Sequence, residues 1–131
     1  MGHLRKWSKG TRGQALVEFA LIVPLLIVIV MGIIEFGRLW MTMITLSGAA
    51  REGARLAAVT APDHDAVETA VENVLSAAGL GPGTITISGP NAQNDVAVTV
   101  EITYTVITGS ILPGFSGSLQ LARSAVMHWE G

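Results

Sequence analysis

The sequence has no cysteine among its 131 residues, which excludes disulfides, thiolate zinc sites and cysteine nucleophiles together. Charge is also scarce: only 14% of the residues are charged and 50% are hydrophobic, whereas about a quarter of an ordinary soluble domain is charged. The net charge of −2 gives no reason to expect a nucleic-acid partner. The length suffices for one modest domain together with a membrane segment.

One long apolar run supplies that segment. Residues 15–34 contain a single charge, Glu18. As a helix rising about 1.5 Å per residue, the run is about 30 Å long, the thickness of a bilayer's hydrocarbon core. Basic residues precede the run and no acid does; they are Arg5, Lys6, Lys9 and Arg12. The positive-inside rule therefore predicts a cytoplasmic N-terminus, with the rest of the chain outside the cytoplasmic membrane.

Glu18 needs an explanation within this run, because a carboxylate at the bilayer centre costs about 2.5–3.5 kcal/mol on insertion scales. A plain signal-anchor helix offers none. A removable secretory signal also fits less well, because Glu35 and Arg38 follow the run where a cut site between small residues is expected. Pro24 removes one backbone donor, so we expect the helix to kink or loosen there.

The helix is predicted to continue from residue 35 to residue 59, which contain no proline. Small and apolar residues follow helical spacing on one face: Leu39, Met43, Leu46, Ala50, Ala54 and Ala57. Two i, i+3 ion pairs are expected on this helix, Glu35 with Arg38 and Glu52 with Arg55. The glycines at 37, 48 and 53 allow close approach of another backbone, either of the chain's own head or of a neighbouring subunit.

Residues 60–131 are predicted to form a small α+β head. After a loop, a short helix begins at Asp65, whose spacing to Glu68 is typical of a capping box, and ends near Gly79. Alternating apolar and polar residues then predict strands around 85–87, over 96–106 and over 119–127, joined as an antiparallel sheet. Arg123 falls in phase with the apolar residues of the last strand, which indicates a bulge or a sheet edge.

The titratable residues give no catalytic pattern. His3, His64 and His128 lack a metal-ligand spacing. Four acids (Asp63, Asp65, Glu68 and Glu72) start an exposed helix, where they favour the positive end of its dipole. No serine has the context of a nucleophile elbow. We expect no enzymatic activity, no cofactor, no metal and no small-molecule substrate.

Three segments carry a family likeness: residues 12–24 (RGQALVEFALIVP), 32–39 (GIIEFGRL) and 49–55 (AAREGAR). In this order and at these distances they resemble the N-terminal helix of TadE-like proteins, the minor pilins or pseudopilins of tight-adherence (Flp-type) pilus systems. The resemblance covers about residues 12–59. It marks Glu35, Arg38, Arg51, Glu52 and Arg55 as the motif of the helix.

The resemblance implies that a prepilin peptidase cleaves between Gly13 and Gln14. The chain then consists of a leader (1–13), a transmembrane and assembly helix (14–59) and an extracytoplasmic head (60–131). Glu18 becomes the fifth residue of the mature protein, and in related pilins that glutamate is thought to meet the new amine of an adjacent subunit. Because two opposite charges attract strongly in a low dielectric, and either alone is costly, the pairing would offset the burial of Glu18.

The likeness has two departures. Gln14 stands where many pilins begin with Phe or Met, and Phe19 follows the glutamate where major Flp pilins favour Tyr. Because major Flp pilins are short and nearly all helix, the substantial head here fits a minor pilin better. The expected partners are the membrane, the prepilin peptidase and other pilins. The alternative is an uncleaved single-span membrane protein whose head binds or scaffolds.

Overall fold

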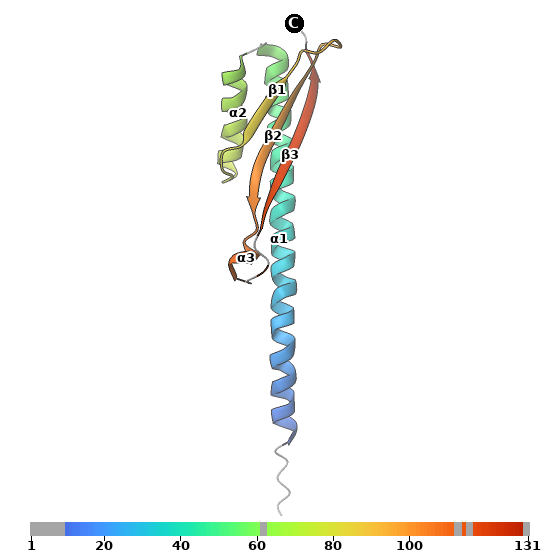
Figure 1. Cartoon of the computed structure of the whole chain (residues 1–131), viewed down its shortest axis with the longest axis vertical. Helices are drawn as coiled ribbons and strands as arrows, with labels where there is room; N and C mark the ends of the chain where they lie inside the picture. The colour runs from blue at the N-terminus through green and yellow to red at the C-terminus, as the bar shows by residue number, and fades with distance from the viewer. Residues whose placement is uncertain (1–9, 61–62, 112–113, 115–116, 130–131) are drawn as a thin grey trace, which may run out of the picture. The chain divides into compact units, whose positions relative to one another are not determined.

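The order of elements follows the predicted plan. The computed structural model describes residues 10–60, 63–111, 114 and 117–129 (Figure 1). The elements are α1 (Gly10–Thr60), α2 (His64–Ala77), β1 (Thr84–Ser88), β2 (Asp95–Thr105), α3 (Thr108–Ile111) and β3 (Ser118–His128). The predicted α+β class, with a long helix, a short helix and three antiparallel strands, is confirmed. The short helix α3 was not predicted, and the basic leader residues 1–9 lie outside the described residues.

Contacts along the chain divide it into two units, one ending at Ile34 and the other beginning at Glu35. In the first unit α1 remains α-helical through Pro24, so the proline does not interrupt it. No residue from 13 to 34 is buried. Among the described residues, α1 is the one helix long and apolar enough to cross a membrane.

The second unit holds the sheet, whose strand order is β1-β2-β3. Both pairings are antiparallel, and the β2–β3 register runs without a break from Asp95↔His128 to Thr105↔Ser118. Arg123 stands opposite Val100 in this register. The predicted bulge is therefore absent, and the alternative of a sheet edge holds, because β3 is the last strand of the sheet.

The core of the second unit forms where α1 and α2 pack on one face of the sheet. Alternate residues of β2 are buried, as the period of two predicts. The cluster joins them to small residues of α1 and to the apolar stripe of α2: Leu46, Ala49, Ala50, Ala54, Ala57, Val67, Val71, Leu75, Val96, Val98, Val100, Ile102, Tyr104 and Leu121. Burial of this apolar surface is what holds the head together.

Gly53 is required at the centre of this core. A Cβ at this position would lie 2.7 Å from Val71 Cγ2 and 3.0 Å from Val98 Cγ1. Both valines are fully buried, so neither has room to move away. Of the two expectations for the helix glycines, Gly53 serves packing against the chain's own head.

The ends of α2 are set by Asp63 and Gly79. The Asp63 carboxylate accepts a hydrogen bond from the Ala66 amide at 3.2 Å and is the N-cap. The prediction that Asp65 is the N-cap was wrong, because the earlier acid already satisfies an amide of the first turn. At the other end Gly79 has φ +70°, and the amides of Gly79 and Leu80 bond the carbonyls of Ser76 and Leu75, which makes a Schellman cap.

Candidate functional site

The predicted cleavage bond lies at the beginning of α1. Gly13 and Gln14 follow the first helical residue, Gly10, by three and four positions. Glu18 lies on the same helix face as Gln14, one turn further on, and the two line a shallow surface hollow together with Gly13, Val17 and Leu21. The structure therefore brings the predicted cleavage site and the predicted assembly glutamate to one face.

Glu18 is exposed and has no hydrogen-bond or ion-pair partner among the described residues. Phe19, the next residue, is also exposed, and Pro24 lies further along the same helix. Because the surrounding surface is apolar, a membrane or a protein neighbour that covers it would also cover this carboxylate. Any charge that neutralises Glu18 there must come from another molecule or from a group outside the described residues.

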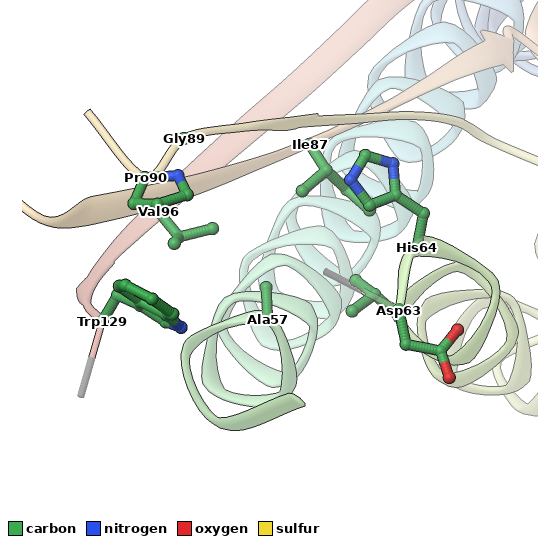
Figure 2. A pocket seen from close by; sticks show the side chains of 9 residues that line it. Ala57, Asp63, His64, Ile87, Gly89, Pro90, Val96 and Trp129 are labelled. Carbon is green, nitrogen blue, oxygen red and sulfur yellow. The ribbon is translucent and has the colours of Figure 1, made fainter. Parts of the chain in front are cut away.

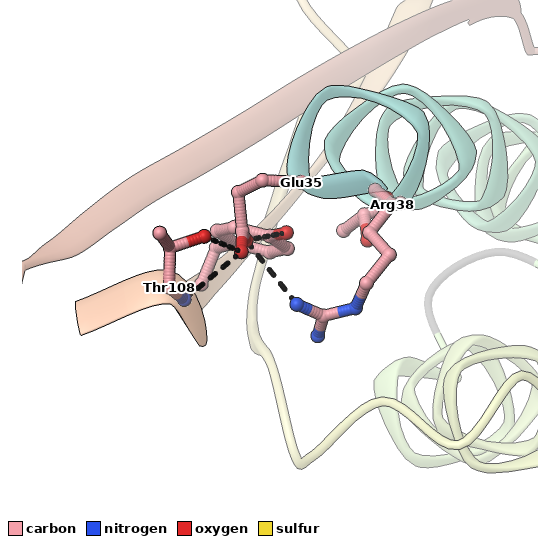
Figure 3. A network of polar contacts seen from close by, with 5 residues as sticks. Glu35, Arg38 and Thr108 are labelled. Carbon is pink, nitrogen blue, oxygen red and sulfur yellow. Dashed lines mark hydrogen bonds and ion pairs between the residues drawn. The ribbon is translucent and has the colours of Figure 1, made fainter. Parts of the chain in front are cut away.

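A second polar constellation gathers around Glu35, the first residue of the second unit (Figure 3). Its carboxylate accepts a short hydrogen bond from the Tyr104 hydroxyl. It also accepts bonds from the Thr108 amide at 3.3 Å and from the Thr108 hydroxyl at 3.1 Å. Glu35 thus ties α1 to the end of β2 and to the start of α3.

Arg38 completes this network. Its Nη1 lies 3.2 Å from Glu35 Oε1, and its guanidinium carbon lies 5.5 Å from the centre of the Tyr104 ring. The hydrogen bond from Tyr104, helped by those from Thr108 and by Arg38, lowers the pKa of Glu35 below its ordinary value, although burial opposes the effect. Burial, followed by the bond to Glu35, raises the pKa of Tyr104.

The sequence predicted the Glu35–Arg38 pair, and the structure confirms it. It did not predict Tyr104 or Thr108, because the period of two placed Tyr104 only on the buried face of β2. One signal was available: a buried tyrosine needs a partner for its hydroxyl, and this is the chain's one tyrosine. The chemistry of the network is structural, since it joins elements and leaves no group free for proton transfer.

The charged residues of the third motif, residues 49–55, differ in whether they have a partner. Glu52 and Arg55 form the predicted pair, with 2.7 Å between Glu52 Oε1 and Arg55 Nη2. Each holds the other charged, so that their hydrogen bond lowers the pKa of Glu52 and raises that of Arg55. Arg51 is exposed and has no polar partner among the described residues. It is the one motif residue whose role the fold of a single chain does not explain.

The head also contains an apolar pocket of about 270 Å³ (Figure 2). Val67, Ile87, Val96 and Trp129 line it, and Asp63 and His64 lie at its border. The Asp63 carboxylate is already committed to capping α2. Within the described part of the chain, no three His, Asp or Glu side chains gather closely enough to hold a metal ion.

Comparisons with known proteins bear on the helix. Neither the curated proteins nor the solved structures gave a match to this chain. A family model did, and its match begins at Gly13, the residue of the predicted cut, and ends at Arg55, the last residue of the third motif. Residues 13–55 match the model of the family described as TadE-like protein, and the predicted resemblance is confirmed.

Proposed function

We propose that this chain is a minor pilin, or pseudopilin, of a tight-adherence pilus system. A prepilin peptidase removes residues 1–13 on the cytoplasmic side, and the mature chain packs through its N-terminal helix with other pilins. The head lies on the extracytoplasmic side. The molecule acts as a structural part of an assembly and performs no catalysis.

The observation that carries this proposal is the surface of residues 13–34. They match the TadE-like family and are unburied over their whole length. An apolar helix of this length needs a bilayer or other helices around it. The lone Glu18 favours helices, because a lipid tail cannot neutralise a carboxylate and an amine on a neighbouring protomer can.

The position of the proposed cut is consistent with processing. The bond between Gly13 and Gln14 lies within the first turns of α1, where helices fray most readily. Local opening of that end would present an extended strand to a protease without disturbing the head. Cleavage creates a new positive amine on Gln14, so that the group that neutralises Glu18 exists only after processing.

Substitution of Glu18 tests the pairing in a host that assembles the pilus. Glu18→Ala should keep or improve membrane insertion, since it removes a charge from the apolar run. It should nevertheless reduce incorporation into the pilus strongly, whereas Glu18→Asp, which keeps the charge, should retain part of it. Membrane fractionation and immunoblotting of sheared pili measure the two steps separately. Normal incorporation of Glu18→Ala would refute the pairing.

One observation favours a second candidate function, an uncleaved membrane protein with a binding head. The apolar pocket beside Trp129 could receive an apolar group of a ligand or partner. This function predicts that residues 1–12 persist in the native protein and that substitutions of Gly13 have no effect. Loss of function in Gly13→Ala, together with an unprocessed N-terminus in that variant, would exclude it.

A further inference from the structure

A groove between α1 and β3 has no occupant among the described residues of this chain. It encloses about 500 Å³ and is lined by Trp40, Ile44, Gly48, Arg51 and Arg123, among others. Trp40 and Ile44 are 62% and 55% exposed, and the rings of Phe36 and Trp40 stack with their centres 6.3 Å apart. A Cβ at Gly48 would meet nothing within 4 Å, so the groove is open at that point.

The two arginines give the groove a positive end. Neither Arg51 nor Arg123 has a hydrogen-bond or ion-pair partner among the described residues, whereas Arg38 and Arg55 are both paired. Arg123 is in phase with the core-facing residues of β3 but remains exposed at the sheet edge. Guanidinium groups with all donors free, set beside exposed apolar rings, are typical of a surface that binds carboxylates on a partner.

The same chain carries a surface of the opposite sign on α2. Asp65, Glu68 and Glu72 are spaced i, i+3 and i+7, which places them on one face of the helix. All three are exposed, and none has a hydrogen-bond or ion-pair partner among the described residues. Thr69 lies on the same face, four residues after Asp65, and its short, exposed side chain lets another element approach closely.

These two surfaces lie on opposite sides of the head. The α2 helix packs beside β1, and Arg123 is on β3, at the other edge of the sheet. They cannot meet within one chain, but they can meet between two chains that stand side by side. Such a contact is heterologous, so it repeats from copy to copy.

The acidic residues of α2 and the two arginines also lie at similar heights along the axis of α1. The Gly53 contact places Val71, the neighbour of Glu72, beside residue 53 of α1. Arg51 is two residues away, about 3 Å along the helix axis at 1.5 Å per residue. Val98 of β2 also lies beside residue 53. Arg123 pairs with Val100, which is two residues from Val98 and so about 7 Å further along the strand at about 3.4 Å per residue.

From this complementarity we propose that the groove receives the acidic face of α2 from a second copy of this chain, with both copies parallel and in one membrane. Glu68 and Glu72 of one copy pair with Arg51 and Arg123 of the next. This deepens the proposed function, since it names a partner for the head, and it rests on it only in that both copies share one orientation. It also gives Arg51 a role that its own chain does not supply.

Because the chain has no cysteine, disulfide trapping provides a direct test. Gly48→Cys in the groove and Thr69→Cys on α2 would be placed on full-length chains with different epitope tags. The two chains would be co-expressed in cells that lack a pilus system, so that orientation is uniform and processing is not involved. Mild oxidation should give the mixed disulfide, and chains that carry the same cysteine should not cross-link. Replacing Thr69→Cys by Thr86→Cys, on the exposed face of the sheet, should abolish the product.

Charge exchange then tests the pairing itself. Adding Arg51→Glu and Arg123→Glu to the Gly48→Cys chain should cause loss of the mixed disulfide, and adding Glu68→Arg and Glu72→Arg to the other chain should restore it. Raising the salt to 1 M, where the Debye length is about 3 Å, should lower the yield. Equal yields from like pairs or from Thr86→Cys, or a mixed product indifferent to the charges, would overturn the proposal. A result of that kind would leave the cleavage of the leader, which is measured separately, unaffected.

Discussion

The two stretches of α1 use the same helical backbone for opposite purposes. From residue 13 to residue 34 no side chain is buried, although most are large and apolar. From residue 42 to residue 58 one face is buried, and its residues are mostly alanine and glycine. Leu26 is 56% exposed and Leu46 is 0% exposed, on one continuous helix.

This contrast teaches that apolar content alone does not say where a helix is buried in its own chain. Residues 42–58 bury small side chains because α2 and the sheet must approach the helix closely. Residues 13–34 carry large aliphatic side chains all round, which suits lipid or neighbouring helices. The size and distribution of the apolar residues, rather than their number, distinguish residues 13–34 from residues 42–58.

Truncation of one leucine in each stretch should give the largest difference in head stability. Leu46→Ala removes a fully buried side chain and should lower the stability of the head by about 2–5 kcal/mol. Leu26→Ala makes the same chemical change on the same helix and should leave head stability unchanged. Hydrogen exchange of the β2 amides, in the full-length protein in detergent, reports head stability directly. Equal effects of the two variants would contradict the division of α1.

Two glycines within residues 42–58 should respond to substitution in opposite directions. Gly53→Ala should destabilise the head by about 1–3 kcal/mol, because the new Cβ meets buried Val71 and Val98. Gly48→Ala should stabilise it by about 0.5–1 kcal/mol, since nothing is near and alanine favours the helix. Thermal unfolding followed by circular dichroism compares them. The same sign of effect at both positions would be evidence against the packing described for Gly53.

The last prediction concerns Glu35, which follows the exposed stretch of α1 and begins the second unit. The Glu35 side chain is 17% exposed, and its pKa is lowered from 4.5. The ionised carboxylate therefore stabilises the head above about pH 4.5, and this stabilisation is lost as the pH falls through the lowered pKa. Glu35→Ala should cost about 1–3 kcal/mol at pH 7, because Tyr104 and Thr108 lose their acceptor. Glu35→Gln should cost less and should flatten the acid limb of head stability. An unchanged acid limb in Glu35→Gln would show that another carboxylate is responsible.

Much of the fold was predictable from the spacing of apolar residues along the sequence. The alternation of β2 and the helical spacing of α1 specify which faces are buried before any contact is known. The N-cap at Asp63 was missed because two acids compete for the role within three residues, and only the path of the loop decides between them. The contacts of Glu35 with Tyr104 and Thr108 span about 70 positions of sequence, and no local pattern encodes such a distance.

The N-terminal part of α1 shows what a sequence does not reveal. Its motif predicted the family match, and the motif residues lie on one helix, as predicted. In the proposed function their role depends on a second molecule, and neither Glu18 nor Arg51 has a partner among the described residues of this chain. A sequence can indicate an unsatisfied charge, but it does not identify a group on another molecule that would satisfy it.

The mass of the native protein, purified from a host with a functional prepilin peptidase, shows whether the leader is removed. Processing at the proposed bond gives a chain that begins at Gln14 and lacks residues 1–13, and it leaves a full-length chain in the same host without the peptidase. A functional native protein that still carries residues 1–13 would contradict the proposed processing, since no new amine would then exist to neutralise Glu18.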